Sequence, residues 1–245
     1  MHKTPTMITV HLKRLRRQAE ISADEERAIR DAVGETRRLP ADEVIVRSGE
    51  EQHSSFILLD GWMARSKDLP SGERQITALH IPGDFPDLHS FTLKCLDHDI
   101  MGLSECTIAT VPHDRLKAIT ERHPRLARLY WLLTNVDGAI SRELVLSLGQ
   151  RSAISRMAHL FCELHARLGA VGRTDGDGYD FPMTQRELSE CLGLTVVHAN
   201  RTLQELRRRN LVECENRRLT ILNGRGLDAL AEFDDSYLFL DRRKL

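Results

Sequence analysis

The sequence lacks a long apolar run, has almost no net charge and contains few cysteines. Residues 1–39 hold no apolar stretch of the kind that a signal peptide or a membrane span requires, so neither is predicted. The formal net charge is −1, so the chain is not a polycation and any nucleic-acid binding must come from local basic clusters. The cysteines are scattered without a C-x-x-C pair, which predicts reduced thiols in a cytoplasmic protein: Cys95, Cys106, Cys162, Cys191 and Cys214.

The length and composition are those of an ordinary soluble globular protein. The 245 residues suffice for one large or two medium domains, with 41% hydrophobic and 29% charged residues. Residues 1–20 hold several basic side chains and are expected to form a loose lead-in. Ser22 and Glu25 have the spacing of a capping box, which predicts a helix from there to about Val33.

From Pro40 to Pro112 the sequence consists of short apolar segments separated by turn residues such as Asp60-Gly61 and Pro82-Gly83-Asp84. Many short strands at close, regular spacing indicate an antiparallel barrel or jelly roll. The predicted strands are Val44–Val46, Phe56–Leu59, Trp62–Ala64, Ile76–Leu79, Ile100–Leu103 and Thr107–Val111.

A long helix is predicted from Pro124, after a short helix from His113 to about Thr120. Apolar residues recur along the long helix at alternating steps of three and four, which is the spacing of a coiled coil. They are predicted to form a dimer interface: Leu126, Leu129, Leu133, Val136 and Ile140. The alternative is a single helix that packs on its own barrel. Residues 148–152 break the pattern and are predicted to be a hinge, with Ser152 as the cap of the next helix.

Residues 184–212 have the outline of a helix, a tight turn and a second helix. Thr184 and Glu187 form another capping-box pattern, and Gly193 ends the first helix because glycine turns the backbone sharply without steric cost. Thr195 can cap the second helix. The inward stripe of that helix is predicted to be Ala199, Thr202, Leu203 and Leu206. An ordinary αα-hairpin shares this outline.

Two neighbouring features favour a DNA-binding unit over the αα-hairpin. The second helix ends in three consecutive arginines, and the segment after it predicts a two-stranded hairpin with a turn at Asn216-Arg217. A helix pair followed by such a hairpin is a winged helix-turn-helix. Base contacts are predicted for His198, Asn200 and Arg201. Phosphate contacts are predicted for Gln185, Thr195, Arg207, Arg208, Arg217 and Arg218.

The predicted fold class is α+β. The predicted organisation is a lead-in at 1–20, an antiparallel β-roll or jelly-roll effector-type domain at 21–122, a dimerisation helix with hinge at 123–150, and a winged helix-turn-helix domain at 151–245.

This order of parts resembles the Crp/Fnr family of bacterial transcription regulators, over about Ile21 to Phe233. The residues that carry the resemblance are Gly49-Glu50, Leu59-Asp60-Gly61, Pro82-Gly83-Asp84-Phe85, Thr184 to Leu188, Gly193-Leu194-Thr195 and Asn200 to Leu203. The resemblance implies a cyclic-nucleotide-binding-like effector domain that repositions two DNA-binding domains in a homodimer on a palindromic promoter site. It also implies contact with RNA polymerase, for which the loop from Ala170 to Gly178 occupies a comparable place.

The chain departs from the family members that bind cyclic AMP. Those follow the Gly-Asp-Phe turn with Gly-Glu-Leu and later carry an arginine for the cyclic phosphate. Here the corresponding segments supply no arginine, and three aspartates would repel an anionic phosphate. Cyclic AMP is therefore not expected as the effector. The candidate effector-pocket residues in these segments are Asp87, Leu88, His89, Asp97 and His98.

The family's iron–sulfur cluster is not expected either. Its members carry an N-terminal cysteine cluster, whereas this chain has no cysteine before Cys95. His80, His89 and His98, with Cys95 and Cys106, could serve a haem, a metal or a redox sensor, or could be ordinary loop and strand residues. We therefore expect no assigned cofactor and no metal site.

The recognition helix differs from the family at one position. Val197 stands where relatives carry a glutamate that contacts cytosine or adenine, and a valine offers only apolar contact, for example with a thymine methyl. Arg201 matches the family arginine that binds guanine, and Asn200 can contact adenine. The expected half-site is therefore related to the family's but not identical.

Two other readings remain open beside the ligand-gated regulator. One is a DNA-binding protein whose barrel is only a scaffold without an effector. The other is a jelly-roll metalloenzyme, which is less favoured because such sites commonly need an H-x-H pair, and Asp97-His98-Asp99 offers one histidine. We predict a regulator and not an enzyme.

Overall fold

The computed structural model describes residues 8–241, which form two compact units. The first unit contains the chain up to Ser66, Leu79–Gly138 and the segment from Phe239; the second contains Lys67–Ala78 and Ala139–Leu238. The units divide inside helix α5 (Pro124–Gln150), between Gly138 and Ala139. Among residues 8–241, no helix combines the length and apolarity needed to cross a bilayer.

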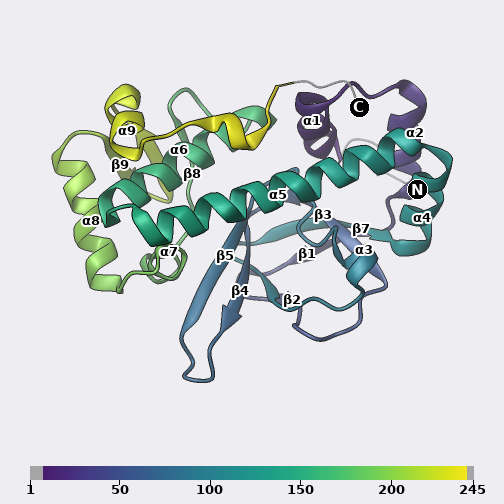
Figure 1. The fold of residues 1–245 in the computed structure, drawn as a ribbon, viewed down its shortest axis with the longest axis horizontal. Coiled ribbons are helices and arrows are strands. Elements are labelled where there is room, and N and C mark those ends of the chain that lie inside the picture. The colour runs from purple at the N-terminus through teal and green to yellow at the C-terminus, as the bar shows by residue number, and fades with distance from the viewer. Residues whose placement is uncertain (1–7, 242–245) are drawn as a thin grey trace. The chain divides into compact units, whose positions relative to one another are not determined.

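The first unit is an antiparallel β-roll with short helices. Its strands form two sheets, in the orders β1-β7-β3 and β2-β6-β4-β5 (Figure 1). The strands are β1 (Thr36–Leu39), β2 (Val44–Val46), β3 (Ser54–Asp60), β4 (Met63–Asp68), β5 (Arg74–His80), β6 (Asp99–Gly102) and β7 (Cys106–Pro112). The predicted roll is confirmed, and each predicted strand overlaps one of these. Strand β1 was missed because three of its four residues are polar and exposed.

Four helices complete this unit besides α5. They are α1 (Thr9–Gln18), α2 (Ala23–Ala32), α3 (Ser90–Leu93) and α4 (His113–Arg122). The predicted capping box of α2 is present: the Ser22 hydroxyl accepts from the backbone N–H of Glu25 at 3.2 Å, and Ser22 N–H donates to the Glu25 carboxylate at 2.8 Å.

The prediction of a loose lead-in at residues 1–20 is wrong for the part that the structure describes. Residues 9–18 form α1, whose apolar face packs into the core of the first unit. Arg14 makes an ion pair with Asp84, and His11 Nδ1 lies 2.8 Å from the backbone oxygen of Gly83. The basic side chains suggested a solvated segment, but two of them hold the 82–85 turn.

The predicted dimer interface also needs correction. Leu126, Leu129 and Leu133 belong to the buried hydrophobic cluster of the first unit, together with residues of α1, α2 and α4. Val136 is buried as well, and Ile140 is half-buried. The alternative prediction, that this face of the helix packs on the chain's own domain, therefore holds for the three leucines. These three leucines are therefore covered by the chain's own first unit.

In the described residues, the second unit contains four α-helices after α5, a 3-10 helix and a three-stranded sheet. Its elements are α6 (Ala153–Val171), β8 (Gly178–Asp180), α7 (Gln185–Leu192), α8 (Val196–Arg208), β9 (Val212–Glu215), β10 (Arg218–Ile221), α9 (Gly224–Ala231) and the 3-10 helix η2 (Asp235–Leu238). The sheet order is β8-β10-β9. Ser152 caps α6 as predicted, by accepting from the N–H of Ser155. The predicted α+β architecture is confirmed.

Gly61 is a position where only glycine fits. Its φ is +84°, in the left-handed region, and a Cβ there would lie 2.2 Å from the backbone oxygen of Glu105. The turn from β3 to β4 thus depends on the absence of a side chain.

We expect Gly61→Ala to lower the free energy of unfolding by about 3 kcal/mol or more, because backbone strain of about 1–3 kcal/mol adds to the steric clash. Gly72→Ala is the matched control, since Gly72 has a φ of +86° but open space around it; it should lose only the strain contribution. Urea unfolding followed by fluorescence measures both. Equal losses in the two variants would contradict the role of the close approach.

Candidate nucleic-acid interface and effector domain

The two helices predicted for DNA binding form as expected. The Thr184 hydroxyl accepts from the N–H of Glu187 at 3.2 Å, and the Glu187 carboxylate accepts from Thr184 N–H, which closes the capping box. Gly193 ends α7 in the left-handed conformation, with a φ of +60°. Thr195 then caps α8 through the N–H of His198. Local hydrogen bonding thus fixes both helix starts.

The faces of α8 divide as the spacing predicted. Its inward stripe is buried against the second unit: Ala199, Thr202, Leu203 and Leu206. The outward residues are exposed and include His198, Asn200, Arg201 and Gln204. In the described part of the chain, Arg201 has neither an ion pair nor a side-chain hydrogen bond. Its guanidinium is therefore available to a base edge.

Two valines lie exposed at the start of α8. Val197 is 69% exposed and Val196 is 46% exposed. Val196 was not among the predicted contacts, although its place directly after the cap signals an outward-facing first turn. Exposed apolar side chains in this position can contact a thymine methyl group, which is the apolar feature of the major groove.

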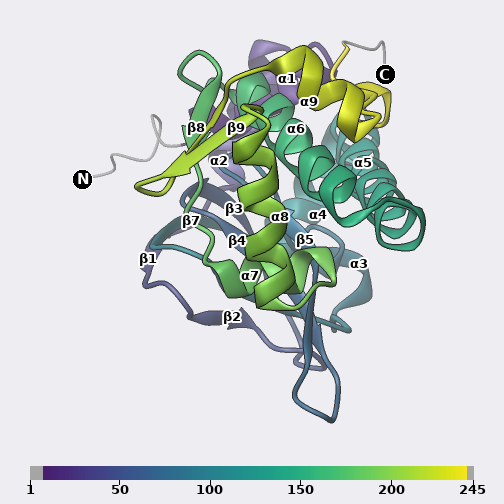
Figure 2. The ribbon, with the colours of Figure 1, turned by 90° about the vertical axis from the view of Figure 1, so that its left-hand side faces the viewer.

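The predicted hairpin is present as β9 and β10 beside α8 (Figure 2). Its two-residue turn places Asn216 and Arg217 at φ of 52° and 58°, as a tight hairpin requires. Arg217 is exposed at the tip. The third strand, β8, was missed because it follows a loop rich in glycine and aspartate.

Most of the predicted phosphate-contacting arginines are ion-paired within the chain. Arg207 pairs with Glu215 at 2.8 Å, Arg208 pairs with Glu205, and Arg218 lies 3.3 Å from the Asp175 carboxylate. A hydrogen bond from Arg209, with the nearby charge of Arg208, lowers the pKa of Glu205. Phosphates would compete with these carboxylates for the arginines. Gln185 is half-buried in the first turn of α7.

The predicted effector-pocket residues differ in burial. Asp87 and Leu88 are buried, whereas Asp97 is exposed and pairs with His98 Nδ1 at 2.9 Å. The rings of His89 and His98 lie 5.2 Å apart. Asp87 accepts from the N–H of Phe56 at 2.8 Å, and burial raises its pKa to about 8. This carboxyl is therefore largely neutral near pH 7 and would not repel an anion there.

A buried arginine that the sequence analysis missed lies in the same region. Arg65 on β4 donates to the backbone oxygen of Pro86 from Nε at 3.0 Å, and to the Asp137 carboxylate at 2.5 Å. The Arg65 guanidinium is thus paired within the first unit. No group of three metal-ligating side chains is found within residues 8–241.

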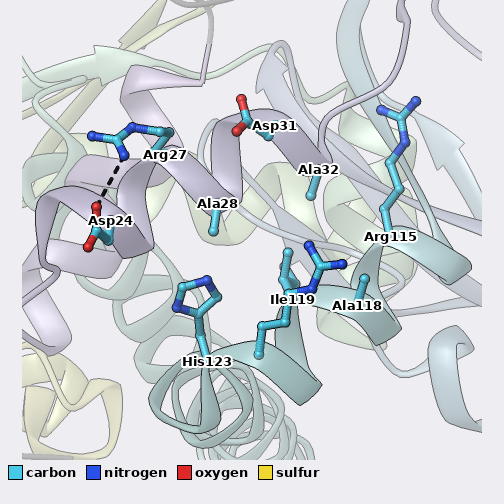
Figure 3. Close-up of a pocket in the computed structure, with 10 residues that line it drawn as sticks. Asp24, Arg27, Ala28, Asp31, Ala32, Arg115, Ala118, Ile119 and His123 are labelled. Carbon is cyan, nitrogen blue, oxygen red and sulfur yellow. Dashed lines mark hydrogen bonds and ion pairs between the residues drawn. The ribbon is translucent and has the colours of Figure 1, made fainter.

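A separate hollow of about 510 Å³ lies between α2 and α4 (Figure 3). Small apolar side chains, Ala28 and Ala118, share its wall with charged ones, and Arg27 bonds to Asp24 at one end at 3.2 Å. None of the predicted effector residues lines it.

Buried histidines predict that acid destabilises the protein. Burial lowers the pKa of His11 and His80 to about 4 and that of His89 to about 3, from 6.5. Between pH 6.5 and 4 the unfolded state therefore binds up to three protons more at these sites. Asp87 opposes this by one proton, because its pKa is raised to about 8 from 3.8. For these four groups the net difference of two protons lowers stability by about 2–3 kcal/mol per pH unit as pH falls through this window. Burial also lowers the pKa values of His98, His113 and His159, which act in the same direction.

Urea unfolding at pH values from 7 to 4.5 measures this dependence. His80→Gln should make the loss of stability with falling pH less steep, because the difference in bound protons between the unfolded and folded states decreases by about one. Stability that rises as the pH falls through this window would contradict the buried neutral state of these histidines.

Comparison with known proteins covers both units. Residues 36–123 match the cyclic nucleotide-binding domain model, and residues 155–230 match the Crp-like helix-turn-helix domain model. The transcriptional activator FnrA of Stutzerimonas stutzeri is 26% identical over 204 residues, 83% of each chain. The nitrogen fixation regulation protein FixK of Bradyrhizobium diazoefficiens is 29% identical over 188 residues, 76% of this chain and 78% of that one. The solved structure of FixK2 from Bradyrhizobium japonicum shares the fold, with a TM-score of 0.74 and 23% identity over 80% of this chain and 96% of that one.

Proposed function

We propose that this chain, which belongs to the Crp/Fnr family of DNA-binding transcription regulators, acts as a homodimer whose copies each bind one half of a palindromic promoter site. The observation that supports this most directly is the outward face of α8, where Arg201 is exposed and without a partner in the described part of the chain. Palindromic sites mirror the two-fold symmetry of the proteins that bind them.

In this proposal the outward side chains of α8 supply the base contacts. Arg201 binds guanine through O6 and N7, and Asn200 contacts adenine. Val197 and Val196 contact thymine methyl groups, and His198 adds a polar contact at the first turn. The half-site therefore keeps a guanine for Arg201. At the base pair that relatives contact with a glutamate, Val197 makes an apolar contact instead.

The remaining basic side chains supply phosphate contacts. Arg217 at the hairpin tip is exposed, whereas Arg207, Arg208 and Arg218 must exchange a carboxylate for phosphate. That exchange takes place only where the phosphates of a bound duplex come within reach of the arginines. Thr195 and Gln185 add contacts at the two helix starts.

The homodimer interface in this proposal is a different stripe of α5. Residues 127, 131, 134, 138, 141, 145 and 148 follow steps of four and three, the heptad spacing of a coiled coil. Trp131 and Val145, two heptads apart, are 69% and 70% exposed. Gly138 lies between them and allows a second helix to come close. Covering these apolar side chains would supply the association energy.

Three finer assignments complete the proposal. The β-roll does not bind cyclic AMP, because Arg65 is bound to Pro86 and Asp137. The loop from Ala170 to Gly178 contacts RNA polymerase, and the protein acts in the cytoplasm, where promoter DNA is found.

Arg201→Ala should abolish selective binding to the palindrome, with a loss of about 1–3 kcal/mol of discrimination per half-site. Arg208→Ala should instead weaken binding to all sequences alike and reduce the salt dependence. Mobility-shift titrations at several salt concentrations, against the palindrome and scrambled DNA, separate the two effects. An unchanged preference for the palindrome in Arg201→Ala would overturn the assignment of α8 as the reading helix.

Trp131→Asp and Val145→Asp should each give a folded monomer, because a charge in the apolar seam opposes association. Leu133→Asp should instead destabilise the fold by several kcal/mol, since Leu133 lies in the core of its own unit. Sedimentation velocity and thermal unfolding distinguish these results. A dimeric Trp131→Asp variant would place the interface elsewhere.

A further inference from the structure

One guanidinium in the second unit joins the ends of two helices. Arg156, in the first turn of α6, donates from Nε to the backbone oxygen of Ser147 at 3.0 Å. Its Nη2 donates to the oxygens of Leu148 at 3.1 Å and Arg151 at 3.2 Å. Its Nη1 donates to the oxygen of Leu192, the last residue of α7. Four backbone carbonyls from three segments thus share one side chain.

The chemistry of helix ends explains why an arginine serves here. The last carbonyls of a helix have no partner within the helix and lie at the negative end of its dipole. The guanidinium is permanently charged and presents five N–H donors in a fixed plane. Arg156 therefore satisfies the ends of α5 and α7 together, and its geometry fixes the position of one end relative to the other.

Other contacts brace the same junction. Arg151 pairs with Glu143 of α5 at 2.7 Å and donates to the Ser147 hydroxyl at 2.7 Å. A Cβ on Gly193, in the turn between α7 and α8, would lie 3.1 Å from Leu148 Cδ2. Gln75 donates to the backbone oxygen of Cys191 at 3.3 Å. The segment predicted as a hinge, 148–152, is thus in contact with α5 through Arg151, with α6 through Arg156 and with the turn at Gly193 through Leu148.

We propose that Arg156 is a positioning residue for DNA recognition, which holds α7 and α8 at one orientation on the end of α5. This rests on the proposed homodimer, in which α5 of each copy forms the interface. With the reading helix fixed to that interface helix, the distance between the two copies of α8 is fixed, and so is the half-site spacing that the dimer accepts. The contacts of α8 with a single half-site do not involve Arg156.

The test compares Arg156→Gln with the unaltered protein. The probe is the palindrome that the unaltered protein selects from random-sequence duplexes, with versions that have one base pair inserted or removed at the centre, and a duplex with a single half-site. Arg156→Gln should keep half-site affinity within about twofold and lose about tenfold or more for the selected palindrome. It should also bind the three spacings with similar affinity, whereas the unaltered protein prefers one.

Three controls make the result specific. Arg225→Gln removes an exposed arginine of α9 in the same unit and should change nothing. Arg156→Lys keeps the charge but has no planar fork, so it should restore the spacing preference only in part. It also carries the test if Arg156→Gln does not fold, which thermal unfolding and sedimentation reveal.

Two results would overturn the proposal. An unchanged spacing preference in Arg156→Gln and Arg156→Lys would show that Arg156 does not position the reading helix. An equal loss on the half-site and the palindrome would show that it only stabilises the fold of the second unit. If the unaltered protein itself bound the palindrome no better than the half-site, the homodimer proposal would fail, and this inference with it.

Discussion

The unsatisfied carbonyls at helix ends are the constraint on which the second unit depends. Arg156 donates hydrogen bonds to the carbonyls at the ends of both α5 and α7. If each helix end were capped by a different side chain, the caps would not fix one helix relative to the other. Helix α5 runs without a break from residue 124 to residue 150, and its part from Ala139 onward belongs to the second unit.

The first unit uses buried charge in a related way. Arg14 on α1 pairs with Asp84 in the 82–85 turn, and Arg65 on β4 pairs with Asp137 on α5. Each pair joins a helix to the β-roll, and breaking either would leave a charge without its partner in a largely water-free place. The histidines around them remain neutral because burial disfavours their charged form. The roll is therefore tied to its helices by polar contacts as well as by the leucines of α5.

Features set by neighbours in sequence were predictable, and features set by distant partners were not. The capping boxes at Ser22 and Thr184 and the hairpin at Asn216-Arg217 involve residues a few positions apart, so their patterns are visible in the sequence. The stripe through Leu133 has coiled-coil spacing, but spacing alone cannot tell a core face from an interface; the Trp131 stripe on the same helix has it too. Arg156 binds backbone carbonyls, which have no sequence signature. Helix α1 was missed because its charges conceal an apolar face.

The exposed face of α8 has a consequence for how such regulators diversify. Val197, Asn200 and Arg201 are exposed, whereas Thr195 caps the helix and Ala199, Leu203 and Leu206 pack in the second unit. Substitutions on the outer face therefore carry little cost in stability. After a gene duplication, one copy could acquire a new set of target promoters through a few changes there, while fold, pairing and spacing stayed inherited.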